Sequence, residues 1–65
     1  MKTYKVTNKH SGEKYTLTVN FKTGTAMVLD KDSEVSEWTA WREEGESLDD
    51  FIARAKKELK NDEDM

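Results

Sequence analysis

Hydrophobic and polar residues alternate in two segments near the N-terminus. Between residues 14 and 22 every second residue is apolar, namely Tyr15, Leu17, Val19 and Phe21. Residues 3–8 alternate in the same way, and their apolar members are Tyr4 and Val6. Because successive side chains of a strand point to opposite faces, both segments are predicted to be strands with one buried face.

Residues 8–13 are predicted to form a turn around Ser11-Gly12, a residue pair that is common in turns. Pairing Val6 with Tyr15 across this turn leaves a loop of four residues. We therefore expect the first two strands to form an antiparallel hairpin in this register.

A second turn is centred on Gly24 and leads to a third apolar stretch. We expect a three-residue loop with Gly24 in the left-handed conformation, because this register buries Met27 and Leu29, the larger apolar residues. The alternative is a two-residue loop, which places Ala26 and Val28 on the buried face instead.

The C-terminal half changes to helical spacing. Apolar residues recur at intervals of three and four after Ser47, and these are Leu48, Phe51, Ile52, Ala55 and Leu59. Ser47 is a favourable N-cap, with Asp50 at the position that completes a capping box. Acidic residues in the first turn and lysines near the end complement the helix dipole. This pattern predicts a helix over about 48–60.

Residues 33–44 fit two structures. Val35, Trp38 and Trp41 are spaced as one stripe of a helix that Gly45 would end, and we favour this helix. A short strand between the two tryptophans is the alternative.

Together these elements predict an α+β fold, with a three-stranded antiparallel meander (β-β-β) followed by one or two helices packed on one sheet face. A chain of 65 residues supports one domain with a core close to the minimum for stable folding. We assign residues 1–60 to this domain and expect residues 61–65 to form a frayed acidic tail.

Composition narrows the class of protein. The chain has no Cys and a single His, which excludes disulfides and zinc sites built from nitrogen and sulfur ligands. No apolar run approaches the roughly 20 residues of a membrane span, and no hydrophobic block of a secretory signal follows the first residues. We therefore expect a cytoplasmic protein that makes no membrane contact.

Charge is distributed unevenly along the chain. Residues 1–31 carry a net charge of +4, whereas residues 32–65 carry −7. A chain divided in this way is expected to have a basic face and an acidic face.

No residue pattern indicates catalysis. His10 lies in a predicted turn without a partner that would tune it as a general base. The segment from Asp30 to Glu34 resembles the start of a calcium loop, but Val35 and Trp41 occupy the positions that require Gly and Glu. We expect no enzymatic activity, no metal and no cofactor.

Two tryptophans lie within a segment rich in carboxylates. The candidate partner-binding residues are Trp38, Trp41, Glu34, Glu37, Glu43 and Glu44. Tryptophan is enriched at interface hot spots, and an acidic surface attracts basic partners. Our leading hypothesis is a non-enzymatic protein-binding module or inhibitor with a basic protein partner, and we favour Trp41 as its anchor. The size and dense charge also suit an accessory protein of a phage or other mobile element.

The alternative hypothesis is a small nucleic-acid-binding domain. The predicted outer face of the sheet is rich in Thr and carries Lys5, Lys14 and Lys22, which could contact phosphates. This face has no Arg, the residue that most often reads base edges. A homo-oligomer that covers exposed sheet edges is compatible with either hypothesis.

Overall fold

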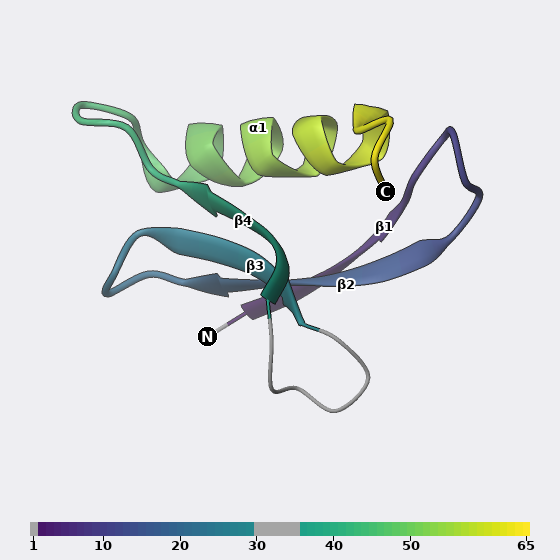
Figure 1. The fold of residues 1–65 in the computed structure, drawn as a ribbon. Helices are drawn as coiled ribbons and strands as arrows, with labels where there is room; N and C mark the ends of the chain where they lie inside the picture. The colour runs from purple at the N-terminus through teal and green to yellow at the C-terminus, as the bar shows by residue number, and fades with distance from the viewer. Residues whose placement is uncertain (1, 30–35) are drawn as a thin grey trace.

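The computed structural model describes residues 2–29 and 36–65, which form one antiparallel sheet covered on one face by a helix (Figure 1). The elements are β1 (Lys2–Thr7), β2 (Lys14–Asn20), β3 (Thr25–Leu29), β4 (Ser36–Trp41) and α1 (Leu48–Asn61). The strands are neighbours in the order β1-β2-β3-β4. The α+β class is therefore confirmed, but the described part of the chain has four strands rather than three, and one helix.

The predicted helix between residues 33 and 44 is wrong: residues 36–41 form β4, so the alternative of a short strand through the two tryptophans is confirmed. Trp38 lies opposite Val28 and Ala40 lies opposite Ala26 on β3. Trp38 and Trp41 are three residues apart, a spacing that places them on one side of a helix but on opposite faces of a strand. Pairing with β3 decides between the two structures, because tertiary context overrides local preference. Val35 lies outside the described residues.

The first hairpin has the predicted register, with Val6 opposite Tyr15. The second hairpin does not: Val19 lies opposite Ala26 rather than Met27. Ala26 and Val28 are consequently buried.

Residues expected in the core are displaced by this change of register. The turn occupies residues 21–24, which is one residue longer than predicted. Phe21 therefore lies in the turn and is 39% exposed, and Leu29 is 38% exposed on the other side of the sheet.

Both hairpin turns share the pattern Asn-x-x-x-Gly. The Asn8 carbonyl accepts a hydrogen bond from the Gly12 N–H at 2.9 Å, and Asn20 accepts from Gly24 at 3.0 Å. Both glycines are left-handed, with φ of 73° and 68°. The Oδ1 atom of each Asn accepts from the backbone N–H groups two and three residues ahead, as in an Asx turn. A Cβ atom at Gly24 would lie 3.3 Å from the Cβ of Arg42, whereas one at Gly12 would meet open space.

The core lies between the inner sheet face and α1. Its buried residues are Val6, Leu17, Val19, Ala26, Val28, Ala40, Phe51, Ala55 and Leu59. The helix begins where it was predicted to begin, because Ser47 Oγ accepts from the Asp50 N–H at 3.1 Å. The three buried helix residues follow helical spacing, which confirms the predicted packing of this helix on the sheet.

Asn8 joins the end of β1 to the C-terminal end of α1. It is fully buried, and its Nδ2 donates to the carbonyls of Leu59 at 2.8 Å and Asp62 at 2.7 Å. The segment predicted to fray has two further contacts: Trp38 Nε1 donates to Asp62 Oδ2 at 3.0 Å, and the Tyr15 hydroxyl donates to the Met65 carbonyl at 3.0 Å. These bonds fasten the last residues to the sheet.

Candidate binding surfaces

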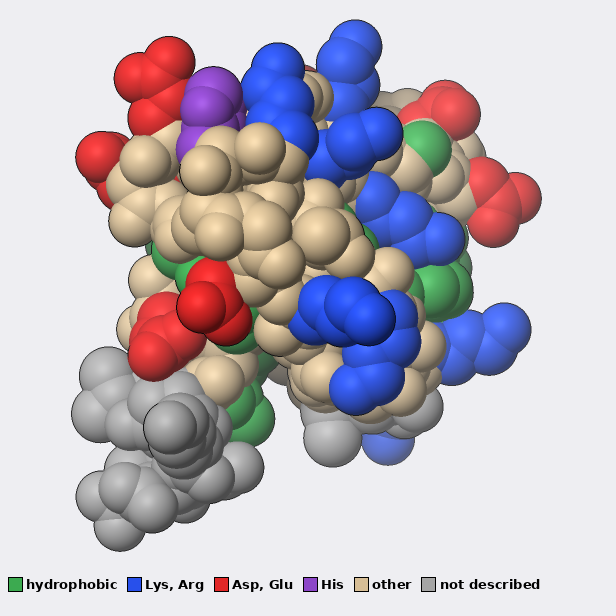
Figure 2. Space-filling view, turned by 90° about the vertical axis from the view of Figure 1, so that its right-hand side faces the viewer, with side chains coloured by type: hydrophobic (Ala, Val, Ile, Leu, Met, Phe, Trp, Pro, Cys, Tyr) green, Lys and Arg blue, Asp and Glu red, His purple; other side chains and the backbone are tan. Residues whose placement is uncertain are grey.

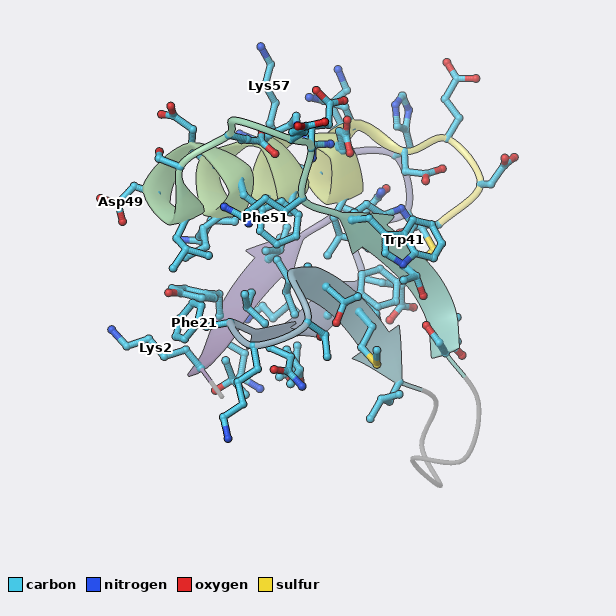
Figure 3. The ribbon with its side chains drawn as sticks, turned by 90° about the vertical axis from the view of Figure 1, so that its left-hand side faces the viewer. Lys2, Phe21, Trp41, Asp49, Phe51 and Lys57 are labelled. Atoms are coloured by element: carbon cyan, nitrogen blue, oxygen red, sulfur yellow. The ribbon has the colours of Figure 1, made fainter. Side chains whose placement is uncertain are left out.

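Trp41 is the most exposed large apolar side chain among the described residues, at 65% exposure. Its neighbour Ala40 points into the core, so Trp41 projects from the opposite face of β4. Figure 3 shows the indole beside β4 and apart from Phe51, which lies beneath the helix. Trp38 differs: it is half-buried against the core, and its indole N–H is bonded to Asp62.

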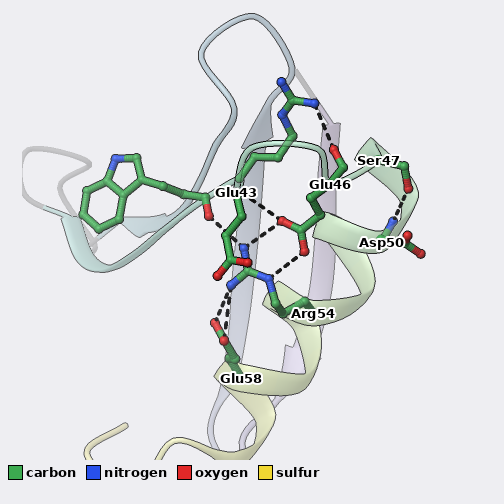
Figure 4. Close-up of polar contacts among 8 residues, drawn as sticks. Glu43, Glu46, Ser47, Asp50, Arg54 and Glu58 are labelled. Carbon is green, nitrogen blue, oxygen red and sulfur yellow. Dashed lines mark hydrogen bonds and ion pairs between the residues drawn. The ribbon is translucent and has the colours of Figure 1, made fainter.

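The Trp41 backbone is held in place by Arg54 of α1 (Figure 4). The guanidinium Nη2 of Arg54 donates to the Trp41 carbonyl at 2.7 Å. The same guanidinium forms a two-pronged contact with Glu46, from Nε at 2.8 Å and from Nη2 at 2.9 Å. It also contacts Glu58 at 3.3 Å and lies over the Phe51 ring. The strand end, the following turn and the helix are thus joined through one side chain.

The negative charge of the Glu46 carboxylate is paired with the Arg54 guanidinium in this network. The hydrogen bonds from Arg54, and then the bond from the Glu43 N–H, lower the pKa of Glu46 from 4.5 to about 2. The hydrogen bonds to Glu46, and then those to Glu58, raise the pKa of Arg54. Glu46 therefore stabilises the turn, and its charge is already paired with Arg54.

The predicted acidic site is only partly assembled in the structure. Glu43 and Glu44 are exposed and follow Trp41 closely in the turn. Glu37 is exposed at the other end of β4, about 13 Å from Trp41 at the usual rise per strand residue. Glu34 lies outside the described residues. Trp41 and two carboxylates thus share one end of β4.

The three lysines of the predicted nucleic-acid-binding face, Lys5, Lys14 and Lys22, are spread along the sheet. Lys14 begins β2 and Lys22 lies in the turn beyond its end, which separates them by at least about 20 Å. Lys5 of β1 donates to Thr16 Oγ1 at 2.7 Å on the outer face of the sheet. These three lysines do not form a compact site.

The structure instead brings other lysines together. A groove of about 540 Å³ lies between Lys5, Val6 and Thr7 of β1 and Lys56, Lys57 and Lys60 of α1. Figure 2 shows basic side chains gathered on this side of the molecule. Sequence reasoning used the helix lysines only as complements to the dipole, because which strand they face depends on tertiary packing.

His10 and possible metal-ligating groups are the remaining candidates for chemistry among the described residues. His10 is exposed in the first turn, where its backbone N–H donates to Asn8 Oδ1. Within residues 2–29 and 36–65 there is no group of three or more His, Cys, Asp or Glu residues placed to hold a metal ion. In the same part of the chain, no helix has the length and apolar character needed to cross a bilayer.

Comparison of the chain with protein-family models, curated proteins and solved structures found no match.

Proposed function

We propose that this chain is a non-enzymatic protein-binding module that binds a basic protein partner through Trp41, Glu43 and Glu44. The observation that carries the proposal is the 65% exposure of Trp41 on a backbone held by Arg54. An exposed indole on a rigid strand end loses little conformational entropy when it is buried by a partner. Tryptophan is enriched among the residues that contribute most of the binding energy at protein interfaces.

The carboxylates and the indole have separate roles in this proposal. Glu43 and Glu44 attract a basic surface and accelerate encounter, so they mainly affect the association rate. Trp41 is desolvated in the complex, so its loss mainly raises the dissociation rate. Action as an inhibitor and origin in a phage or other mobile element remain hypotheses from size and composition.

The test compares partner capture by the wild type and by matched variants. Proteins are captured from a nuclease-treated lysate of the source cells, identified, and then measured individually by surface plasmon resonance. Trp41→Ala is expected to weaken binding by about ten-fold or more through a faster dissociation rate, while thermal stability changes little. Glu43→Lys with Glu44→Lys is expected to slow association. Lys14→Glu, a charge change far from Trp41, serves as the matched control.

Two results would overturn the proposal. The first is a set of captured proteins that binds the wild type and Trp41→Ala equally well. The second is a loss of several kcal/mol of stability in Trp41→Ala, which is the usual cost of truncating a buried aromatic residue.

A further inference from the structure

Strand β1 presents an unpaired backbone edge. In the described part of the chain it is the first strand of the sheet and has β2 as its single neighbour. The Asn8 N–H donates to the Glu13 carbonyl, which identifies this pair as a hydrogen-bonded pair of the antiparallel ladder. Hydrogen-bonded and non-hydrogen-bonded pairs alternate, so the N–H and C=O groups of Thr3, Lys5 and Thr7 point away from β2. A second extended chain could pair with these groups.

The groove runs along this edge. Its strand side is lined by Lys5, Val6 and Thr7, three consecutive residues whose side chains alternate between faces, so the groove follows the strand rather than one face of the sheet. Helix α1 forms the other side. The Lys9 N–H donates to the Lys60 carbonyl at 2.9 Å and closes one end. A strand edge beside a helix is the setting in which several domain classes bind extended peptides.

The groove is strongly basic. Lys5, Lys56, Lys57 and Lys60 line it, and no carboxylate is among its lining residues. Lys56 lies over the ring of Tyr4, with Nζ 4.1 Å from the centroid, and this cation–π contact orders the lysine. The Lys5 ammonium is bonded to Thr16 on the outer face of the sheet, whereas Lys56, Lys57 and Lys60 come from the helix. The three helix ammonium groups exceed the partial negative charge of the helix C-terminus, which is equivalent to about half an electron.

We propose that the β1 edge and this groove bind an extended acidic peptide segment of a partner protein by β-strand addition. Backbone hydrogen bonds to Thr3, Lys5 and Thr7 align the segment, and its carboxylates face Lys56, Lys57 and Lys60. This site is at the opposite edge of the sheet from Trp41 and does not depend on the function proposed for Trp41.

A peptide fits these observations better than a nucleic acid. The open strand edge offers alternating donors and acceptors that match an extended polypeptide. The residues that line the groove include no Arg and no aromatic ring, so base stacking has no platform there.

The probe is a fluorescein-labelled peptide of about ten residues in which Glu and Thr alternate, long enough to span β1. Fluorescence anisotropy is expected to show saturable binding to the wild-type protein. Lys56→Glu with Lys60→Glu is expected to weaken binding by about ten-fold or more. The matched control, Lys14→Glu with Lys22→Glu, carries the same change of net charge outside the groove and is expected to retain binding within about three-fold.

Two N-methylated peptides test strand addition itself. One peptide is methylated at the backbone nitrogens of Glu and the other at those of Thr, so the two peptides carry the same charge. Alternate N–H groups of an extended chain point to opposite edges, so each peptide has one edge that cannot donate hydrogen bonds. Strand addition predicts that one methylated peptide fails to bind and the other binds. Amide exchange at Thr3, Lys5 and Thr7 is expected to slow when the unmethylated peptide is bound.

Several outcomes would overturn the proposal. Equal binding of both methylated peptides would show attraction by charge alone. Tighter binding of a ten-nucleotide oligo-dT with the same dependence on Lys56 and Lys60 would assign the groove to nucleic acid. Self-association of the wild type that is lost in Lys56→Glu with Lys60→Glu would assign it to a second copy of the chain. Absence of peptide binding at millimolar concentration would remove the site altogether.

Discussion

Replacing Asn8 is predicted to be among the most damaging single changes to this fold. Its side chain is fully buried and uses all of its polar groups. The amide nitrogen donates to the Leu59 and Asp62 carbonyls at 2.8 and 2.7 Å. The oxygen accepts from the backbone of His10 and Ser11 at 2.8 and 3.0 Å. One residue therefore shapes the first turn and joins it to the end of the helix.

The magnitude follows from these four bonds. Each is worth about 0.5–1.5 kcal/mol in a folded protein, and buried groups left without a partner cost more. Asn8→Ala is therefore expected to lose about 2–6 kcal/mol. A domain of this size rarely exceeds about 3–5 kcal/mol of total stability. The variant should consequently be largely unfolded in buffer and refold in trimethylamine N-oxide.

Asn20 provides the matched control, because it occupies the same place in the second Asn-x-x-x-Gly turn. Its Oδ1 accepts from the N–H groups of Lys22 at 3.0 Å and Thr23 at 3.4 Å, while its amide nitrogen is not bonded to the helix. Asn20→Ala is expected to cost about 0.5–1.5 kcal/mol. The difference between the two variants measures the connection between β1 and α1.

The assay is urea denaturation of all three proteins in a fixed concentration of trimethylamine N-oxide, with a shared slope. Equal midpoint shifts for Asn8→Ala and Asn20→Ala would refute the reasoning. Asn8→Asp adds a second check, since it places a carboxylate against the two carbonyl oxygens and raises the pKa of that carboxyl in the folded state. The loss of unfolding free energy in Asn8→Asp, relative to the wild type, should be smallest at low pH, where the carboxyl is protonated, and should grow as pH rises.

Three further predictions concern the turns and the chain end. Glu46→Gln should lower the urea midpoint at neutral pH, because Arg54 holds the pKa of Glu46 at about 2, below its usual 4.5. The wild type loses this stabilisation as pH falls from 4.5 towards 2, so a difference in urea midpoint that stays constant over that range would contradict the argument. Gly12→Ala should cost about 1–2 kcal/mol in thermal melts from left-handed strain, and Gly24→Ala should cost more, since its Cβ is crowded; equal losses would show that crowding has no effect. Deleting residues 62–65 should cost about 2–3 kcal/mol, whereas an unchanged melting temperature would support the frayed tail.

Local patterns were sufficient to predict the helix and the first hairpin. Ser47 and the apolar spacing define α1, because capping and amphipathicity are properties of neighbouring residues. The register of the second hairpin depended instead on Asn20, whose side chain shapes a four-residue turn. The sequence does contain the corresponding signal: Asn8 and Gly12 are repeated twelve residues later as Asn20 and Gly24. The repeat indicates that the two turns have the same length.

Strand β4 and the Arg54 network could not be derived from local patterns. The stripe that includes Trp38 and Trp41 fits a helix equally well until β3 is available as a neighbour. The pair Arg54 and Glu58 is recognisable from its spacing, but Glu46 is eight residues from Arg54 and meets it through the path of the turn. Exposure of Trp41 follows from the same strand, because its alternation places Ala40 in the core.

The uneven distribution of charge along the sequence does not predict where charged side chains gather in the folded protein. The division into a basic N-terminal half and an acidic C-terminal half predicts a sheet that supplies the cations. In the groove, however, Lys56, Lys57 and Lys60 come from the acidic half and join Lys5 because Asn8 holds the ends of β1 and α1 together. The acidic half in turn places Glu43 and Glu44 near Trp41 at the opposite edge. Net charge by segment therefore does not locate the candidate surfaces in the fold; the junction at Asn8 and the order of the strands do.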